Sequence, residues 1–244
     1  MSEPPIIEVD KLSKRFGAIE ALRETSFTVA EGEIFGLIGH NGAGKTTCLR
    51  ILSTLLSPSG GRASVCGFDV AKEPEQVRRV ISYLPEEAGA YQHLSGWEFL
   101  EFMASFYTQG ARERGEMVEE AAAICDLGER LGDSVKTYSK GMLRRILLAR
   151  TLMVRPRVAI LDEPTSGLDV LQSIKIREII KEYSKQGTTV LLSSHNMLEV
   201  EYLCDRVALI YQGRVLVEGA PGELKEKWGK ANLEEVFREV STHG

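Results

Sequence analysis

A glycine-rich segment near the start of the chain carries residue types that hold phosphate groups. The run GHNGAGKTT at Gly39–Thr47 fits the pattern G-x-x-x-x-G-K-S/T. Gly42 and Gly44 let the backbone curl until successive N–H groups point at one spot. Lys45 adds a mobile positive charge for the β- and γ-phosphates of a nucleotide, and the Thr46 hydroxyl is a hard oxygen ligand for Mg²⁺. The motif predicts an Mg-ATP site made by Gly39, His40, Asn41, Gly42, Ala43, Gly44, Lys45, Thr46 and Thr47.

The segments on either side of this loop support the interpretation. Glu33–Ile38 has the pattern of an apolar strand running into the loop, and Thr47–Leu56 that of a helix running out of it. The motif requires this order of strand, loop and helix, because the helix N-terminus adds a positive end to the site. The alternative, a glycine-rich turn with a chance lysine, does not explain the flanking elements. We interpret His40 inside the loop as a spacer.

Two acidic residues end a second apolar run. Val158–Leu161 reads as a buried strand and is followed by Asp162 and Glu163. Ligands bind at the carboxyl ends of strands in open α/β sheets, so both side chains are expected at that edge. Asp162 is expected to hold Mg²⁺ through water, and Glu163 to position or deprotonate an attacking water. Taken alone, the pair could equally cap the turn at Pro164; the phosphate loop upstream favours the functional reading.

A histidine follows another strand. His195 comes directly after the apolar run Thr189–Ser193, again at a carboxyl end. A histidine at a strand end is more often structural, but its position downstream of the two acids favours a bond to the γ-phosphate. We therefore place His195 with Glu163 as the predicted catalytic residues.

Composition sets the broad class of the protein. The chain has 244 residues, 43% of them hydrophobic and 27% charged, which suits one α/β domain with an embellishment or two small domains. The net charge of -5 argues against general nucleic-acid binding, which needs a basic surface. The negative net charge does not exclude a nucleotide-binding site, because binding phosphate needs only local N–H groups and one or two positively charged groups.

Location can also be predicted. No apolar run reaches the roughly 18–20 residues of a membrane helix, and the start of the chain has no signal-peptide pattern. The four cysteines are widely spaced, which is typical of free thiols in a reducing compartment: Cys48, Cys66, Cys125 and Cys204. A cytoplasmic protein is expected, and any membrane association would come through a partner.

The order of the expected elements indicates how these residues are positioned. Short β-rich runs alternate with helical patterns, as in parallel-sheet units, and Gln212-Gly213 reads as a hairpin turn. Between about Trp97 and Val154 the apolar spacing is helical throughout, which predicts a helical insert in the α/β core. The chain after Pro221 reads as a charged helical tail. The strands are expected at Ile6–Val9, Ser26–Val29, Ile34–Ile38, Ile81–Leu84, Val158–Leu161, Thr189–Ser193 and Val207–Ile210.

Taken together, these motifs resemble the ATPase subunits of ABC transporters over about Ile6 to Gly219. Phe16 matches the aromatic that stacks on adenine, although a core aromatic is the alternative. Tyr138–Met142 stands at the place of the family's signature, opening a helix, and Ser166–Asp169 at the place of the loop that crosses the dimer. Gly39–Thr47, Asp162, Glu163 and His195 match the phosphate loop, the Mg²⁺ aspartate, the catalytic glutamate and the switch histidine.

The resemblance implies a fold and a mechanism. The fold is α/β: a phosphate-loop NTPase core with a mixed sheet, an N-terminal antiparallel β part and an inserted helical subdomain at about 87–155. Residues 1–220 would form the ATPase domain and residues 221–244 the helical tail. Such subunits hydrolyse ATP as a head-to-tail dimer, so Ser139 and Gly141 would bind the ATP held by a second subunit, either an identical copy or a paralogue. Removal of ATP then opens the dimer and drives a membrane partner.

Two departures from the family pattern affect the site. Glu86 stands where a glutamine is usual, at a position that touches Mg²⁺ and the membrane subunit; we expect Glu86 still to sense the metal. In the signature, Lys140 and Met142 replace a glycine and a glutamine. Lys140 either adds positive charge toward the phosphate or faces solvent.

The segments YLPEE and YSKGM resemble the subgroup that powers exporters of sodium, drugs and antibiotics. This resemblance implies a separate integral-membrane permease and a place on the cytoplasmic face of the membrane. The alternatives are the ATPase of an importer, which often carries a sizeable C-terminal domain, and a soluble non-transport ABC ATPase, which usually fuses two ATPase domains. A phosphate-loop kinase would leave the Ser166–Asp169 and His195 elements unexplained.

Overall fold

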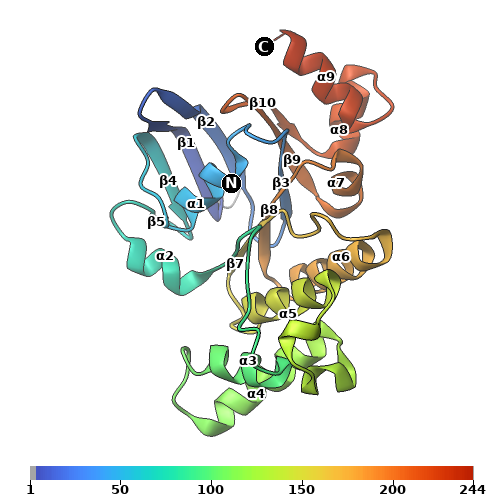
Figure 1. Ribbon diagram of the computed structural model, residues 1–244. Coiled ribbons are helices and arrows are strands. Elements are labelled where there is room, and N and C mark those ends of the chain that lie inside the picture. The colour runs from blue at the N-terminus through green and yellow to red at the C-terminus, as the bar shows by residue number, and fades with distance from the viewer. Residues whose placement is uncertain (1–3, 244) are drawn as a thin grey trace.

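The computed structural model describes residues 4–243, which form two β-sheets with helices around them (Figure 1). The smaller sheet is antiparallel, with the strand order β2-β1-β4-β5. Its long strands β1 and β2 form a hairpin from the N-terminal part of the chain. The strands of this sheet are β1 (Ile7–Phe16), β2 (Ile19–Val29), β4 (Gly60–Val65) and β5 (Phe68–Asp69).

The larger sheet has six strands in the order β10-β9-β3-β8-β7-β6. Neighbouring strands from β9 to β6 are parallel, and only β10 at the edge is antiparallel, so the sheet is mixed. Every residue of β3, β7 and β8 is buried, as expected for central strands covered on both faces. The strands are β3 (Ile34–Ile38), β6 (Ile81–Leu84), β7 (Val158–Asp162), β8 (Thr189–Ser194), β9 (Arg206–Tyr211) and β10 (Arg214–Gly219).

The helices fall into three groups. Helices α1 (Lys45–Leu52), α2 (Pro74–Val80), α6 (Val170–Lys185) and α7 (Met197–Leu203) belong to the α/β core. Between β6 and β7 the chain forms α3 (Gly96–Ala104), α4 (Ala111–Cys125), two short 3-10 helices and α5 (Lys140–Leu152). Figure 1 shows α3 and α4 at the opposite end of the molecule from α8 (Pro221–Trp228) and α9 (Leu233–His243), which close the chain.

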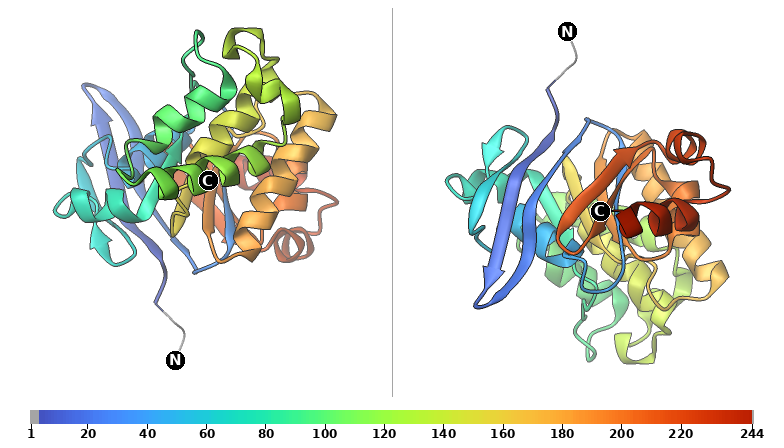
Figure 2. Two further views of the ribbon diagram at one scale, coloured as in Figure 1. Left: turned by 90° about the horizontal axis from the view of Figure 1, so that it is seen from below. Right: turned by 90° about the horizontal axis from the view of Figure 1, so that it is seen from above.

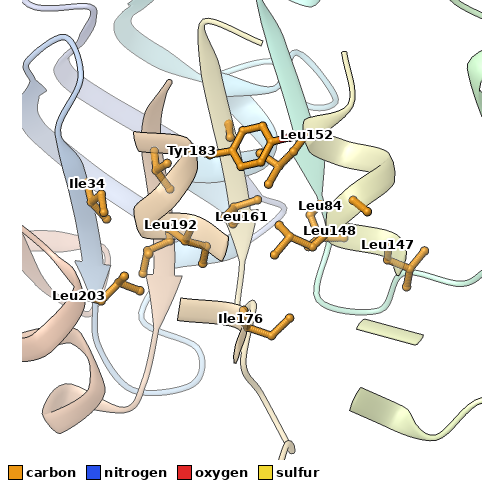
Figure 3. Packing of buried hydrophobic residues seen from close by; sticks show 14 of the residues in the cluster. Ile34, Leu84, Leu147, Leu148, Leu152, Leu161, Ile176, Tyr183, Leu192 and Leu203 are labelled. Carbon is orange, nitrogen blue, oxygen red and sulfur yellow. The ribbon is translucent and has the colours of Figure 1, made fainter. Parts of the chain in front are cut away.

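Two hydrophobic clusters hold these layers together. One lies on the sheet face covered by α5, α6 and α7, and Figure 3 shows Leu84, Leu161 and Leu192 of the strands packed with helix side chains. The other fills the space between the two sheets, where Phe27 and Phe35 stack with ring centroids 5.4 Å apart. Each fully buried large apolar side chain contributes roughly 1.5–3 kcal/mol of stability.

Helix α1 lies in the second cluster, between the two sheets (Figure 2). Its residues Cys48, Leu49, Ile51 and Leu52 are buried there. The packing fixes the helix N-terminus at the end of β3, beside the antiparallel sheet. The loop before α1 is therefore held from two sides, by the strand that enters it and by the helix that leaves it.

The structure confirms the predicted fold: an α/β core with a mixed sheet, an antiparallel N-terminal part and a helical insert. The predicted hairpin at Gln212-Gly213 is present, with φ values of 46° and 78° that suit a tight turn between right-twisted strands. The helix predicted at Thr47–Leu56 instead runs from Lys45 to Leu52, because Gly44 ends the loop at φ 107° and Thr54 adopts φ 59°. The domain boundaries at 87–155 and after 220 stay a prediction.

Other expectations concern the cysteines and the membrane. Cys48, Cys66, Cys125 and Cys204 are all free, and burial raises the pKa of Cys48 to about 12, which makes it unreactive. Within residues 4–243, no helix combines the length and apolar character needed to cross a bilayer.

Candidate nucleotide-binding site

The glycine-rich segment forms a compact loop between β3 and α1 (Figure 1). Gly42 and Gly44 have φ values of 81° and 107°, a left-handed region that other residues rarely adopt. Gly39 has no room for a side chain, since a Cβ there would lie 2.2 Å from the carbonyl oxygen of Ile210. No side chain caps the N-terminus of α1, so its first N–H groups are available to a ligand.

A cavity of about 400 Å³ lies over this loop. Its volume is within the range of pockets that hold small molecules. Phe16, at the end of β1, is 48% exposed and lies on the cavity wall, so the alternative of a core aromatic is wrong. The ammonium of Lys14 lies 5.1 Å from the centre of the Phe16 ring. The lining residues are Phe16, Ala21, His40, Asn41, Gly42, Ala43, Gly44, Lys45, Thr46, Thr47, Glu86 and Glu163.

Lys45 brings a buried positive charge into the floor of the cavity. Its Nζ donates a hydrogen bond of 2.6 Å to the carbonyl of Gly39 and lies 3.2 Å from Oε1 of Glu163. The lysine and the glutamate are each only 5% exposed. Glu163 Oε1 is buried and makes no hydrogen bond to any residue in 4–243. The contact is thus an ion pair between two buried groups, joining the phosphate loop to the end of β7.

Asp162 is the last residue of β7, and three hydroxyl groups surround its carboxylate. Thr46 Oγ1 and Ser193 Oγ donate to Oδ1 at 3.1 and 2.6 Å, and the Tyr83 hydroxyl donates to Oδ2 at 3.3 Å. Burial, followed by the charge of Asp162, raises the pKa of Tyr83 to about 12, so Tyr83 stays a donor. The sequence predicted Asp162 and Thr46 but did not predict Ser193 or Tyr83.

The oxygen atoms of Thr46 and Asp162 are suitable ligands for Mg²⁺, which prefers hard oxygen donors. Across residues 4–243 there is no group of three or more His, Cys, Asp or Glu residues that could hold a metal by themselves. A cation beside Thr46 and Asp162 would therefore take its other ligands from phosphate oxygens and water. This is how Mg²⁺ is usually bound at nucleotide sites.

Glu163 lies just beyond β7 in an unusual backbone conformation. Its φ of 48° is in the left-handed region, which costs roughly 1–3 kcal/mol for a residue other than glycine. The N–H of Glu163 donates to Ser193 Oγ at 3.0 Å, and its carboxylate Oε2 lies 2.8 Å from Nδ1 of His195. His195 is 47% exposed at the end of β8. The two predicted catalytic residues are therefore in contact, and one of them has a strained backbone.

Glu86 follows β6 and Pro85 and lies on the cavity wall. Its carboxylate accepts a long hydrogen bond of 3.5 Å from Ser166 Oγ. Ser166 belongs to the segment that the family resemblance places at a dimer contact. Glu86 thus lies between the cavity and that segment.

Ser139 and Gly141 are not brought to the cavity over the phosphate loop. Ser139 caps the N-terminus of α5, and its Oγ accepts from the N–H of Met142 at 3.3 Å. Gly141 is buried, and a Cβ there would lie 2.6 Å from the side chain of Gln172. Lys140 is exposed to solvent, and its ammonium lies beside the backbone of Gly167.

Two contacts of the site have no signal in the sequence. Arg144 of α5 reaches the carbonyl groups that follow β6 and β7. His40, which we interpreted as a spacer, packs edge-on against Phe237 of α9, with ring centroids 4.9 Å apart. Phe237 also makes an edge-on contact with Tyr211 of β9. Both contacts join residues far apart in the chain, and only the folded structure reveals them.

The comparisons agree with this geometry. The model of the ABC transporter family matches residues 22–166, which extend from β2 past Glu163. A daunorubicin resistance ATP-binding protein, DrrA3 of Streptomyces coeruleorubidus, is 39% identical over 98% of this chain and 75% of its own length. An uncharacterized ABC transporter ATP-binding protein of Synechocystis is 41% identical over 84% of this chain, which spans only 58% of that relative.

A solved structure extends the likeness to the whole fold. The structure of an ATP-binding subunit of an ABC transporter superposes with a TM-score of 0.85 at 31% identity, covering 97% of this chain and 99% of the other. The antiparallel sheet, the mixed sheet and the helical insert are thus all within the shared fold. The chain belongs to the ABC transporter family, as one of its ATP-binding, ATP-hydrolysing subunits.

Proposed function

We propose that this chain is the motor subunit of an ABC-type exporter, which binds Mg-ATP over the phosphate loop and hydrolyses it in a head-to-tail dimer. The observation that carries the proposal is that Glu163, on the cavity wall, contacts both Lys45 and His195. The ion pair of 3.2 Å and the histidine contact of 2.8 Å join a positive charge, a carboxylate and an imidazole, and this supports the proposal that the three groups act on one phosphate.

Each group has a role that follows from its position. Phe16 stacks on the adenine ring at the open side of the cavity. The N–H groups of the loop and of the start of α1 bind the β- and γ-phosphates, and Lys45 turns from Glu163 toward them. Thr46 and Asp162 would hold Mg²⁺, which would neutralise negative charge on the phosphate groups.

Hydrolysis then requires a base for the attacking water and a hydrogen-bond donor for the γ-phosphate. Glu163 lies on the cavity wall, where its carboxylate orients the attacking water and takes its proton. His195 stays half-exposed and donates to the γ-phosphate while it holds Glu163 through Nδ1. Glu86, also on the cavity wall, would sense the metal. The buried surroundings of Lys45 and Glu163 strengthen each of these electrostatic interactions.

The dimer follows from the position of the signature residues. Ser139 and Gly141 open α5 away from the cavity of their own chain, so they serve a nucleotide only if a second copy, or a paralogue, presents one. A helix N-terminus with an exposed serine is a suitable site for phosphate oxygens. Two half-sites joined head to tail would each be completed by the other.

The export role and the partner rest on relatives. DrrA3 is named for daunorubicin resistance, which suits a subunit that powers removal of a drug from the cell. The partner would be a separate integral-membrane permease, and this chain would lie on the cytoplasmic face of the membrane. The alternatives are the ATPase subunit of an importer and a soluble ATPase of the family.

Two experiments distinguish these functions. Association of this chain with membranes that is lost when the permease is removed would support the proposal over a soluble ATPase. Export of a labelled drug would distinguish an exporter from an importer.

The direct test is ATP hydrolysis by the purified chain with Mg²⁺. We expect phosphate release that rises steeply with protein concentration, because dimerisation completes the site. Failure to bind or hydrolyse ATP, with or without the permease, would contradict the proposed activity.

A further inference from the structure

One buried arginine that was not predicted from the sequence bonds to the backbone beneath the site. Arg144 lies in the second turn of α5 and is 8% exposed. A guanidinium carries five N–H groups, and here it makes five hydrogen bonds, all to main-chain carbonyl groups. Nε donates to Pro164 at 2.8 Å, Nη1 to Pro85 and Glu86 at 3.0 and 3.1 Å, and Nη2 to Asp162 and Glu163 at 2.8 and 2.7 Å.

These carbonyl groups belong to the two segments that leave the sheet at the site. Pro85 and Glu86 follow β6, and residues 162–164 span the end of β7 and the turn after it. Because three consecutive carbonyls at 162–164 accept from one rigid group, the peptide planes on both sides of Glu163 are fixed. Glu163 has the left-handed φ of 48°, which its own side chain disfavours.

The charges around Arg144 are also unusual. Burial lowers its pKa, while Asp162, Glu86 and Glu163 act in the opposite direction, and an arginine remains charged in any case. The positive charges of Lys45 and Arg144 therefore both lie near the acidic residues of the site. Lys45 contacts a carboxylate directly, whereas Arg144 contacts only the backbone beneath the carboxylates.

Its neighbour Arg145 shows what a purely structural arginine looks like on the same helix. Arg145 is 7% exposed, so the two side chains are buried to the same degree. It donates to the carbonyls of Cys125 and Asp126 at the end of α4, away from the cavity. Burial and bonding to carbonyl groups are thus common to both residues, but Arg145 makes two hydrogen bonds where Arg144 makes five, and its acceptors lie outside the site.

We propose that Arg144 is a positioning residue for ATP hydrolysis, which aims the carboxylate of Glu163 by fixing the backbone at 162–164 and ties that backbone to the Glu86 segment. The proposal rests on the proposed hydrolytic function. Arg144 also belongs to the helix that begins at Ser139, so any movement of this helix reaches Glu163 through the guanidinium. In a dimer, closure of α5 on the partner's ATP would in this way adjust the catalytic carboxylate of its own chain.

The test compares Arg144→Lys with Arg145→Lys in the full-length chain, using steady-state ATP hydrolysis and equilibrium ATP binding. A lysine keeps the charge but has three donors on one atom, so it cannot hold five carbonyls. We expect Arg144→Lys to lower kcat about 100-fold, the scale of a small misplacement of a catalytic group, with KM and ATP affinity within about threefold of wild type. Arg145→Lys is expected to keep kcat within about threefold.

A double-mutant cycle with Glu163→Gln separates positioning from general damage. If Arg144 acts through Glu163, then Arg144→Lys lowers the residual rate of Glu163→Gln by less than about threefold, because the group it positions is already gone. An equal loss in both backgrounds, or a kcat of Arg144→Lys within threefold of wild type, would overturn the proposal. A Glu163→Gln protein with wild-type activity would instead contradict the proposed function.

Folding is checked by the melting temperature of each variant. If Arg144→Lys is unfolded at the assay temperature, Arg144→Gln, which is uncharged and has two donors, is measured in the same way. If both Arg144 variants fail to fold while Arg145→Lys folds, Arg144 is a structural residue and the proposal is wrong.

Discussion

Two helix N-termini of this chain are candidates for binding phosphate, and they differ in how their first N–H groups are satisfied. Helix α1 follows Gly44, and no side chain caps it. Helix α5 follows Ser139, whose hydroxyl caps it by accepting from the N–H of Met142. The uncapped end lies in the 400 Å³ cavity beside the buried Lys45.

The difference indicates which half of the site is built within one chain. At α1 the free donors, the lysine and the carboxylates of Asp162 and Glu163 are already assembled. At α5 the exposed Ser139 satisfies its own helix and lies outside the cavity. We therefore propose that the first end binds ATP by itself, and that the second contributes only when another copy brings the nucleotide to it.

The largest expected effect concerns chemistry at the first end. Glu163→Gln removes the proposed base and should lower hydrolysis by about 10²–10⁴-fold. Binding of ATP should persist, since the loop and Lys45 remain, and the protein should accumulate as an ATP-dependent dimer on a sizing column. A variant that retains the wild-type rate would remove Glu163 from the catalytic role.

The next effect concerns affinity at the same end. Lys45→Ala removes a charged donor and leaves Glu163 buried without its ion pair. We expect ATP affinity to fall roughly 10–100-fold, the scale of hydrogen bonds to charged groups, and the melting temperature to fall as well. Titration with a fluorescent ATP analogue measures the affinity, and exposed Lys72→Ala is the control. Unchanged binding would contradict the assignment of the phosphate loop.

A smaller effect is expected at the second end. Ser139→Ala removes the cap of α5 and should cost about 1 kcal/mol of stability. ATP binding to the dilute single chain should not change, whereas hydrolysis at high protein concentration should fall about tenfold through loss of a bond to phosphate. If Ser139→Ala lowered the ATP affinity of the monomer as much as Lys45→Ala does, the proposed difference between the N-termini of α1 and α5 would be wrong.

The smallest expected effect concerns the metal. Glu86→Gln replaces a carboxylate on the cavity wall by a neutral amide, which attracts a cation less. The Mg²⁺ concentration for half-maximal hydrolysis should rise roughly two- to fivefold. The exposed neighbour Glu87→Gln is the matched control. Unaltered Mg²⁺ dependence and turnover would show that Glu86 does not sense the metal.

The sequence predicted those parts of the site that depend on local order. The phosphate loop is one continuous segment between a strand and a helix. Asp162 and Glu163 stand at the end of a buried strand. In both cases the neighbouring residues in the sequence were enough to locate the site residues. Parallel pairing of β7 with β8 then brings His195 to Glu163, as the strand ends suggested.

Other features depend on tertiary contacts that leave no pattern in the chain. The acceptors of Arg144 are carbonyl groups, which every residue carries, so nothing in the sequence distinguishes Arg144 from Arg145. Strand β4 was not predicted, because its run GGRASV is rich in glycine and is formed by pairing with β1. The partner of His40 lies on the last helix, almost 200 residues away.

That contact between His40 and Phe237 has a thermodynamic consequence. One ring belongs to the phosphate loop and the other to α9, whose residues Leu233, Val236 and Phe237 are buried. Any ligand that binds the loop more tightly with His40 moved away from Phe237 must loosen the docking of α9. By reciprocity, anything that pulls α9 away changes the affinity of the loop for that ligand by the same factor. For such a ligand, the phosphate loop and the C-terminal helix are linked in free energy although the ligand and the helix need never touch.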